Sequence, residues 1–554
     1  MRKILYLTLL LSMLCPSITM SSQKDSEAAD LIKTVVSKIE PAMKEYSIAS
    51  WKATTTGKKE WYKKYGDAEI AFRKILSDKG TFEKIKDLKK AKISDPILKR
   101  QIDLIYLDYL ENQIDPSLNE ELVRMGRALE EKFNTFRAKI DGVETTDNKI
   151  RVTLKKSKDM AEREKTWEAS KQIGALVAPD LIALVKERNK AARSLGFKNF
   201  YTMYLELGEQ NENELFGVLD KLAQLTKGPF KDLKKEIDEA LAKRYGIKVS
   251  ELKPWHYEDV FFQEAPEVYN VDLDKYFKGK DIVKLVKDYY SGMGLPIDDV
   301  LARSDLFERK GKEQHAYCTN IDREGDIRIL ANVKSDERWA STMLHESGHA
   351  AYEKYYAKDL PYLLREPPHI FTTEAIAELF GRLTNNASWL KGTLDKSKQS
   401  EFESLKPNLE KALRANALFF VRWVEVMTHF ERALYSNPDQ NLNKLWWNLV
   451  EKYQLVKKPS GRDNPDWAAK IHFTTAPVYY HNYLLGELLA SQLLHYIDKN
   501  IAKKDEAFVA NKKTGEYLKE KVFAPGDRLR WDDHIKYATG EKLTPKYFAE
   551  EFIK

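Results

Sequence analysis

Two histidines that stand four residues apart, His345 and His349, constrain the fold of this chain more than any other feature. Side chains at positions i and i+4 lie on one face of a helix, so both imidazoles can reach one metal ion if the segment LHESGHA (344–350) is helical. Glu346 directly follows the first histidine and would lie beside the metal, where it can take a proton from a water molecule. This spacing is typical of zinc metalloproteases.

A catalytic zinc ion needs a third protein ligand and one open position. Two prolines at 367 and 368 precede the segment TTEAIAELF (372–380), which predicts a new helix that begins near Thr372. Glu374 and Glu378 share one face of this helix among apolar neighbours, where a carboxylate is unfavourable without a positive partner. We therefore predict that Glu374 is the third ligand and that Glu378 accepts a hydrogen bond from a metal-binding histidine. The alternative is an ordinary exposed helix face.

The segment before the histidine helix has the pattern of a β-hairpin. Residues 315–321 and 326–333 are strand-like, and 323–325 can form the turn. Ser335 can cap the helix that follows, and Asp336 and Glu337 suit its first turn. A free strand edge beside the metal helix can bind an extended peptide. A structural hairpin that covers the core fits the same pattern equally well.

The rest of the chain is predicted to be helical. Long amphipathic stretches with few glycines or prolines run from Ser26 to Phe133, from Leu181 to Arg193 and from Glu212 to Tyr245. Gly246 suits the end of the last of these helices. The composition, 43% hydrophobic and 32% charged, is that of a soluble protein, and no internal repeat or clear linker divides the 554 residues. We therefore expect an all-α fold in a single large domain.

The first residues have the pattern of a targeting segment. Arg2 and Lys3 precede an apolar run at 4–14 that is too short to span a bilayer, and small residues follow at 17–22. This predicts a signal peptide over 1–21, a mature domain over 22–554 without a membrane span, and export to the periplasm or the extracellular space. Cys15 leaves a lipid anchor as an alternative, although Leu14 stands where lipoproteins have a small residue.

Charge and cysteine content exclude other classes. The net charge is only +7, and the basic residues alternate with acidic ones along the chain. No nucleic-acid motif is present, so a nucleic-acid partner is not expected. Cys318 is the only cysteine after the targeting segment, so an intramolecular disulfide is excluded. A lone cysteine of this kind is more typical of a buried apolar position than of a nucleophile. The oligomeric state is not indicated by any pattern.

Several motifs resemble the angiotensin-converting-enzyme family of zinc peptidyl-dipeptidases. They are the histidine motif followed by EAIAE (374–378), the segment LWWNLVEKYQ (445–454) and the segment ALAKRYG (240–246). The resemblance runs from about residue 30 to the C-terminus and is weakest in the N-terminal third. It implies an almost wholly helical fold with a deep central cleft and one zinc ion per chain. It also implies that the N-terminal helices, within 22–150, form a lid over the zinc.

The same resemblance implies roles for further residues, carried over where the motifs match. His315 and Ala316 would pair with the substrate backbone. Lys470 and Tyr480 would hold the C-terminal carboxylate of the substrate. His472 would stabilise the tetrahedral intermediate, and Tyr483 would donate to the oxyanion. The implied substrates are peptides with a free C-terminus, and the implied products are C-terminal dipeptides.

The chain departs from the family pattern at two places. The segment from His472 to Tyr483 is one residue longer than in the family, so Tyr479 competes with Tyr480 for the carboxylate-binding position. Val450 and Asn482 stand where the family has chloride-binding arginines. Because neither side chain can hold a buried anion as arginine does, we expect chloride activation to be weak or absent.

Three alternatives remain open from the sequence. An oligoendopeptidase or a single-residue carboxypeptidase could use the same helical zinc scaffold, because the residues around Lys470 do not define how many residues fit beyond the zinc. A catalytically silent, exported peptide-binding protein is a different class, which the intact ligands and Glu346 argue against. A metalloregulated structural lipoprotein would rest on Cys15 alone.

Overall fold

The computed structural model describes residues 15–269, 271–309, 312–313, 316–394, 396–503 and 506–553. Most of the predicted signal peptide, 1–21, lies outside these residues, and so does His315. Export and the lipid anchor at Cys15 therefore stay predictions. In the described part of the chain, no helix combines the length and the apolar character needed to cross a membrane.

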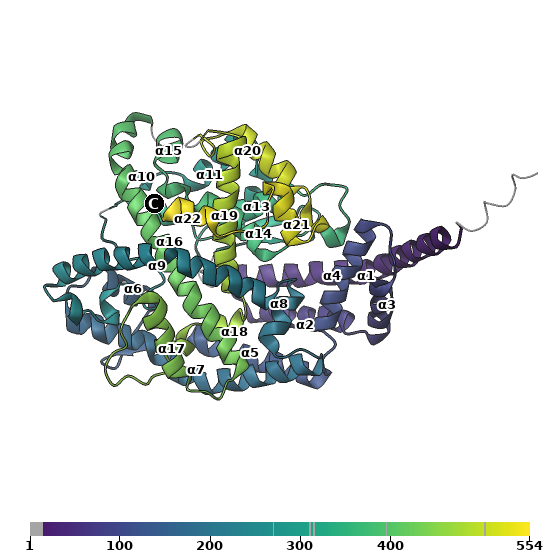
Figure 1. The fold of residues 1–554 in the computed structure, drawn as a ribbon, viewed down its shortest axis with the longest axis horizontal. Coiled ribbons are helices and arrows are strands. Elements are labelled where there is room, and N and C mark those ends of the chain that lie inside the picture. The colour runs from purple at the N-terminus through teal and green to yellow at the C-terminus, as the bar shows by residue number, and fades with distance from the viewer. Residues whose placement is uncertain are drawn as a thin grey trace, which may run out of the picture.

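The fold is almost wholly helical, which confirms the all-α prediction (Figure 1). The N-terminal part contains α1 (Cys15–Thr56), α2 (Lys59–Leu76), α3 (Lys79–Lys90), α4 (Pro96–Glu111), α5 (Pro116–Thr135), β1 (Ala138–Ile140), β2 (Val143–Thr145) and α6 (Asp147–Lys156). The central part contains α7 (Met160–Ser194), α8 (Phe200–Leu207), α9 (Glu212–Tyr245), α10 (Asp274–Phe277), α11 (Ile282–Gly292), α12 (Asp298–Arg303), β3 (Tyr317–Asn320), β4 (Ile327–Leu330), α13 (Glu337–Lys354) and α14 (Ile370–Gly381). The C-terminal part contains α15 (Ala387–Trp389), α16 (Gln399–Ser436), α17 (Leu442–Leu449), α18 (His472–Thr475), α19 (His481–Asn500), α20 (Lys512–Tyr517), α21 (Trp531–Thr539) and α22 (Lys546–Phe552).

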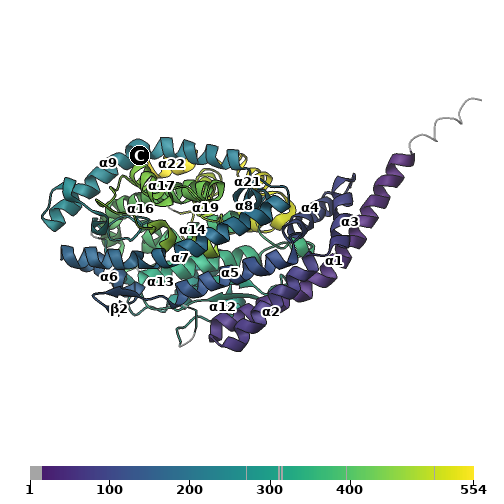
Figure 2. The ribbon, with the colours of Figure 1, turned by 90° about the horizontal axis from the view of Figure 1, so that it is seen from below.

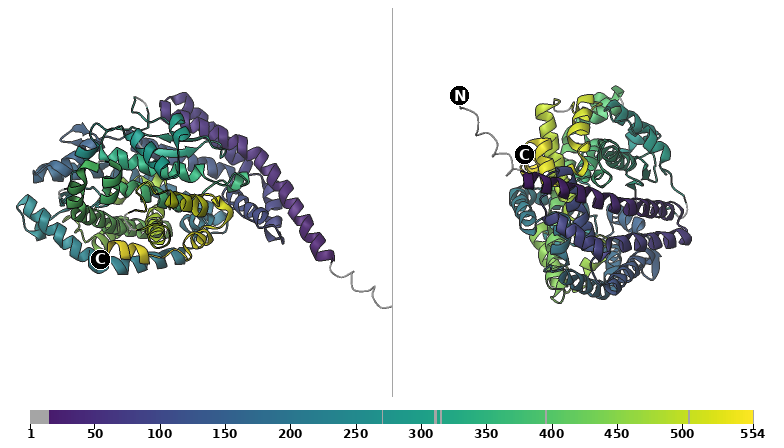
Figure 3. Two further views of the ribbon diagram at one scale, coloured as in Figure 1. Left: turned by 90° about the horizontal axis from the view of Figure 1, so that it is seen from above. Right: turned by 90° about the vertical axis from the view of Figure 1, so that its right-hand side faces the viewer.

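The first helices form a region with a small hydrophobic core of its own. Helices α1 and α2 run side by side, and α1 projects from one end of the molecule (Figure 3). Apolar side chains of α1, α3 and α4, such as Ile39, Ile85 and Ile105, pack together. Tyr362 and Leu363, from the segment between α13 and α14, belong to the same cluster. The N-terminal helices thus rest on the segment that joins the two motif helices, and their role as a lid stays a prediction.

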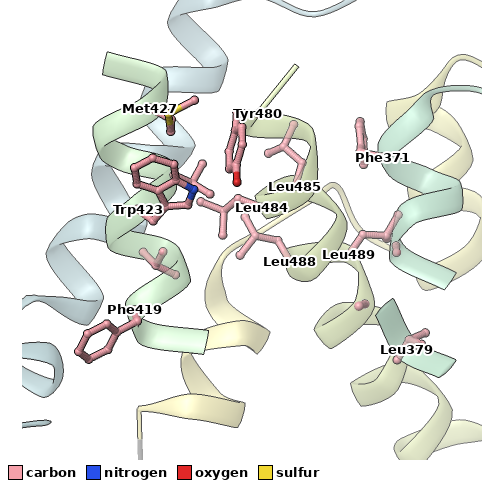
Figure 4. Close-up of a cluster of buried hydrophobic side chains, with 14 of the residues drawn as sticks. Phe371, Leu379, Phe419, Trp423, Met427, Tyr480, Leu484, Leu485, Leu488 and Leu489 are labelled. Atoms are coloured by element: carbon pink, nitrogen blue, oxygen red, sulfur yellow. The ribbon is translucent and has the colours of Figure 1, made fainter. Parts of the chain in front are cut away.

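The main core lies between α14, α16 and α19 (Figure 4). Leu484, Leu485, Leu488 and Leu489 stand on the buried side of α19, at the spacing of a helix face that points into a core. Trp423 of α16 packs against Tyr480, which directly precedes α19, with the ring centroids 5.7 Å apart. This core holds α14 and the start of α19 rigidly beside each other.

Two long helices, α7 and α9, enclose α16 from two sides (Figure 2). Helix α9 begins after Asn211, whose side chain accepts from the backbone N–H groups of Asn213 and Glu214, and it ends at Gly246 in the left-handed conformation with φ 67°. Its bounds, Glu212–Tyr245, confirm the predicted helix and its glycine cap.

The predicted hairpin before the histidine helix is present. Strands β3 and β4 pair antiparallel, with Tyr317 opposite Leu330 and Asn320 opposite Ile327. The predicted cap is wrong by one residue, because the Asp336 side chain accepts from Trp339 N–H at the start of α13. The Ser335 hydroxyl instead donates to the Lys280 carbonyl, 2.8 Å away. A second hairpin, β1–β2, was not predicted, because its three-residue strands are too short to produce a periodic pattern.

Candidate active site

Three glycines let the helices of the metal motif approach closely. A Cβ atom on Gly348 of α13 would lie 3.0 Å from the Cα of Ala377 in α14. A Cβ on Gly381 would lie 3.2 Å from the Cβ of His345, and a Cβ on Gly486 of α19 would lie 3.1 Å from the Cβ of Glu374. Glycine at these positions lets α13, α14 and α19 meet around the motif side chains.

His345, His349 and Glu374 converge as the sequence predicted. One ligand atom from each lies within 4.8 Å of the others. Glu374 Oε2 is 3.7 Å from His345 Nε2 and 3.8 Å from His349 Nε2. This oxygen is buried and has no hydrogen-bond partner. A bound cation would satisfy it. Two imidazole nitrogens and one carboxylate oxygen are a donor set that suits zinc. We call His345, His349 and Glu374, together with Glu346, the metal centre.

A neighbouring side chain orients one of the two histidines. His349 Nδ1 lies 2.7 Å from Thr373 Oγ1. A histidine that offers Nε2 to a metal carries its proton on Nδ1, so Nδ1 would donate to this hydroxyl. His345 Nδ1 is 3.8 Å from Glu378 Oε1, which is longer than a hydrogen bond. The acceptor role of Glu378 therefore stays a prediction, and Thr373 is an orienting residue that the sequence analysis missed.

Glu374 is held by a tyrosine. The Tyr479 hydroxyl donates to Glu374 Oε1 over 3.1 Å, which leaves Oε2 facing the histidines. Burial raises the pKa of the Glu374 carboxyl above its usual range, and the nearby His345 imidazole and this hydrogen bond oppose the rise. Tyr479 thus binds the predicted metal ligand.

Glu346 lies on α13 beside strand β3. It is 7% exposed, and its carboxylate accepts a hydrogen bond from the backbone N–H of Cys318. Burial raises the pKa of Glu346 to about 7, and the charge of Glu374 adds to the rise, while His345 opposes it. Cys318 is partly buried and packs against the main core, which departs from the predicted fully buried position, and its surroundings raise the pKa of its thiol.

Lys470 lies in a second cluster, which we call the lysine pocket. Its Nζ donates to Gln263 Oε1 over 2.9 Å. The same nitrogen lies 5.4, 5.1 and 5.3 Å from the ring centroids of Phe261, Trp423 and Tyr480. Burial lowers the pKa of Lys470 to about 8, although Asp259 raises it. An ammonium group with aromatic neighbours and one amide partner can bind an anionic group.

A row of tyrosines connects the lysine pocket to the metal centre. The Tyr483 ring centroid is 5.2 Å from that of Tyr479 and 5.3 Å from that of Tyr480. Tyr480 in turn lies 4.9 Å from the ring of His472. The chain turns at Val478, with φ 55°, so consecutive tyrosines point to different groups: Tyr479 to Glu374 and Tyr480 to Lys470.

The structure brings most of the predicted residues into these two neighbouring groups. Lys470, His472 and Tyr480 lie together, and Tyr483 lies between them and the metal centre. Ala316 directly precedes β3 and packs against the main core, while its neighbour His315 lies outside the described residues. Gln263 was missed, because it lies in an irregular loop far from Lys470 in the sequence.

Two cavities lie at the N-terminal helices, away from the metal centre. One of about 810 Å³ is lined by residues that include Arg100, Asp103 and Gln210. The other, of about 260 Å³, is lined by residues that include Asp108, Arg323 and Tyr362. The deep central cleft that the resemblance implies stays a prediction.

A family model described as angiotensin-converting enzyme matches residues 22–256 and 262–550. The angiotensin-converting enzyme-like protein Ace3 of Mus musculus is 22% identical over 455 residues, 74% of this chain and 59% of that protein. The angiotensin-converting enzyme of Bos taurus is 24% identical over 379 residues, 62% of this chain and 28% of that protein. The inactive angiotensin-converting enzyme-related protein of Caenorhabditis elegans is 22% identical over 282 residues, 48% of this chain and 29% of that protein. The chain thus spans less than two thirds of the length of these relatives.

Proposed function

Because the chain belongs to the angiotensin-converting enzyme family, we propose that it is a zinc metallopeptidase that releases dipeptides from the C-terminus of peptides. The observation that carries this proposal is the metal centre, where an unpartnered buried carboxylate oxygen faces two imidazole nitrogens. The lysine pocket beside it supports the preference for a free C-terminus.

His345, His349 and Glu374 would hold one zinc ion. When bound, zinc supplies a Lewis acid that polarises the peptide carbonyl and lowers the pKa of a water molecule. Thr373 would keep the His349 ring in the tautomer that offers Nε2, and Tyr479 would keep Glu374 Oε2 turned toward the histidines.

Glu346 would act as the general base. Its carboxylate takes the proton of the attacking water and later passes it to the leaving amine. The backbone N–H of Cys318 holds the carboxylate in place at strand β3. In the described part of the chain, β3 pairs only with β4, so an extended peptide could add along its other edge. His315 and Ala316, just before β3, would pair with the backbone of that peptide.

The lysine pocket would bind the C-terminal carboxylate of the substrate. Lys470 offers a charged donor, and Tyr480 and Gln263 are next to it. Tyr480 suits this role better than Tyr479, because Tyr479 is bonded to the metal ligand Glu374. The enzyme would then measure its cleavage position from the end of the peptide.

Tyr483 and His472 would stabilise the oxyanion that forms as water attacks the carbonyl. Tyr483 contacts both Tyr479 and Tyr480, so it lies between the metal centre and the lysine pocket, where the cleaved bond would be. A hydroxyl that is fixed in this position before the reaction donates to the developing charge without reorganisation.

Chloride activation is not expected. Val450, at one of the two arginine positions, is 1% exposed. Asn482, at the other, accepts from Gln210 Nε2 over 3.1 Å, and Gln210 Oε1 is 2.7 Å from His481 Nε2. Burial also lowers the pKa of His481 to about 3, so this group of three side chains is neutral and lacks the positive charge that an anion needs. A predicted exported location, periplasmic or extracellular, accompanies the proposal.

Two other functions use the same residues. An oligoendopeptidase or a single-residue carboxypeptidase would keep the metal centre and differ in the space beyond the zinc. A silent peptide-binding protein has a precedent in a relative that is named inactive. Intact metal ligands and Glu346 favour catalysis in this chain.

Mass spectrometry of the products from one peptide in two forms, with a free and with an amidated C-terminus, tests the proposal. Dipeptides from the free form alone, lost after treatment with a chelator, are expected. Internal cleavage of both forms would favour the endopeptidase, and single residues would favour the carboxypeptidase. No cleavage by zinc-loaded protein would favour the binding protein.

A further inference from the structure

Lys171 of α7 is a buried lysine without a carboxylate partner. It is 5% exposed, and its Nζ donates to the backbone carbonyl of Val260 over 2.7 Å. Among the described residues no acidic side chain forms an ion pair with it, because the nearby Asp466 is bound by Arg462. A buried ammonium that has one carbonyl and two aromatic rings as partners, but no carboxylate, is unfavourable for folding, which indicates a role in function.

The carbonyl that Lys171 binds belongs to the loop that carries Gln263. Residues 257–261 of this loop lie between the two segments that match the family model. Trp167, one turn before Lys171 on α7, also donates to the Val260 carbonyl, over 3.2 Å. Both contacts come from the side chains of a rigid helix, so α7 fixes the loop at Val260.

The loop holds a strained conformation that depends on these contacts. Phe262 has φ 60°, a left-handed value that is unfavourable for an aromatic residue. Gln454 donates to the carbonyls of Phe261 and Phe262 over 3.1 and 2.9 Å. Asp259 accepts from the backbone N–H groups of Phe261 and Gln263. Together these bonds aim Gln263 at Lys470.

Lys171 and Lys470 also share an aromatic neighbour. Nζ of Lys171 lies 3.4 Å from the ring centroid of Phe261, and Nζ of Lys470 lies 5.4 Å from the same centroid. The Phe261 ring therefore contacts both ammonium groups, and the positive charge of Lys171 stands behind the lysine pocket.

We propose that Lys171 is a positioning residue for the C-terminal carboxylate of the substrate. It fixes the 257–263 loop, so that Gln263 stays in contact with Lys470. This inference rests on the proposed function and deepens it, because it assigns the binding of the carboxylate to two lysines with different tasks. Lys470 touches the carboxylate, and Lys171 acts through the loop.

The charge of Lys171 depends on pH. Burial lowers the pKa of Lys171 to about 7, and the charges of Arg462 and Lys470 act in the same direction, while Asp466 and Asp259 oppose them. The charged groups that face Lys470 are Asp259 and Glu264, which raise its pKa, and Arg151, which lowers it. Because Lys171 has lost most of its charge at the pH where Lys470 titrates, its removal should leave the pKa of Lys470 at about 8.

The experiment compares Lys171→Met with the wild type in the zinc-loaded full chain. Kinetic constants are measured against pH for a peptide with a free C-terminus, and the inhibition constant is measured for its amidated form. Loss of one hydrogen bond to a charged donor predicts that KM of the free peptide rises about tenfold, while kcat changes less than about twofold. The inhibition constant of the amidated form should not change, and the apparent pKa in the KM profile should stay at its wild-type value.

Two further variants test the loop. Gln454→Met removes two other hydrogen bonds to the loop, those to the carbonyls of Phe261 and Phe262, so KM should rise in the same way. Lys171→Arg keeps a donor for the Val260 carbonyl, so its KM should lie closer to the wild type than that of Lys171→Met. If Lys171→Met does not fold, Lys171→Gln, which is neutral and shorter than lysine, takes its place.

An unchanged KM in Lys171→Met would overturn the inference. So would a rise in the KM of the free peptide that is matched by an equal rise in the inhibition constant of the amidated form, because that is the result of a purely structural defect. If the wild type does not distinguish free from amidated peptides, the proposed function itself is wrong. If the wild type does distinguish them and Lys171→Met has the same KM as the wild type, only this inference is wrong.

Discussion

The metal centre and the lysine pocket are built in different ways, although a row of tyrosines joins them. In the metal centre, all three predicted metal ligands come from two short motifs on the adjacent helices α13 and α14. In the lysine pocket, Lys470 follows a short helical turn, Gln263 lies in a loop, and Trp423 lies on α16. The segments of the pocket are joined only by tertiary contacts.

The difference teaches which part of such a site depends on helix geometry and which depends on loops. The helix spacing and the close glycine contacts leave the predicted metal ligands few alternative positions. The pocket depends on a loop with a strained Phe262 and on bonds from α7. Changes in the metal centre should therefore affect turnover, whereas changes in the pocket should affect substrate binding.

The largest effect is expected for Glu346→Gln. The variant keeps the shape and the hydrogen bond from Cys318 but cannot take a proton, so kcat should fall by about 10⁴ while the zinc content stays equal to the wild type. Steady-state kinetics and metal analysis measure both. Glu353→Gln, on the same helix beyond the ligands, is the control and should keep its kcat. Substantial turnover by zinc-loaded Glu346→Gln would place the base elsewhere.

Tyr483→Phe tests the junction of the two regions. Removal of a hydroxyl that donates to the oxyanion should lower kcat by about 10²-fold with little change in KM. The position of Tyr483 between Tyr479 and Tyr480 is the reason for this expectation. Single-turnover kinetics separate the chemical step from product release. A rise in KM alone would assign Tyr483 to the lysine pocket instead.

The pH dependence of KM tests the lysine pocket. The pKa of Lys470 is lowered to about 8 by burial, so its charged form is lost as the pH rises through that value. KM for a peptide with a free C-terminus should then rise about tenfold per pH unit above this pKa. Lys470→Met is the control, with a KM that is high and independent of pH. The measurements extend to pH 9.5, about 1.5 units above the pKa of Lys470. A wild-type KM that does not change over this range would contradict the role of Lys470.

Tyr479→Phe separates the two adjacent tyrosines. Tyr479 donates to Glu374 and not to the pocket, so zinc should bind about tenfold more weakly. Discrimination between free and amidated peptides should be the same as in the wild type. Competition with a zinc chelator measures the affinity. Tyr480→Phe should keep the zinc affinity of the wild type and lose discrimination between free and amidated peptides. If the two variants show each other's results, Tyr479 binds the substrate carboxylate and Tyr480 holds Glu374.

The smallest effect is expected for chloride. Addition of chloride at constant ionic strength should change kcat/KM by less than about twofold, because Asn482 and Val450 cannot hold a buried anion. Acetate salts of the same concentration are the control. A several-fold activation by chloride would mean that other cationic side chains hold the anion.

Several parts of this fold could be predicted because their causes are local. Helix α9 has an asparagine cap, an amphipathic pattern and a terminal glycine, and its predicted bounds are the observed ones. The helix cap at Asp336 was placed one residue early, because serine and aspartate both suit a cap and the contact of Ser335 with Lys280 decides between them. Gln263 had no local signal, since irregular loops carry no periodic pattern.

The residues that can bind a metal follow from the order of side chains along the chain, because a helix converts a spacing of four into a common face. This applies to His345 and His349, and it applies to Glu374 once α14 is recognised as a helix. Tertiary structure alone decides that Tyr479 binds Glu374, that Tyr480 contacts Lys470, and that Gln263 and Lys171 meet at the 257–263 loop. These contacts join residues far apart in the chain, and only packing brings them together.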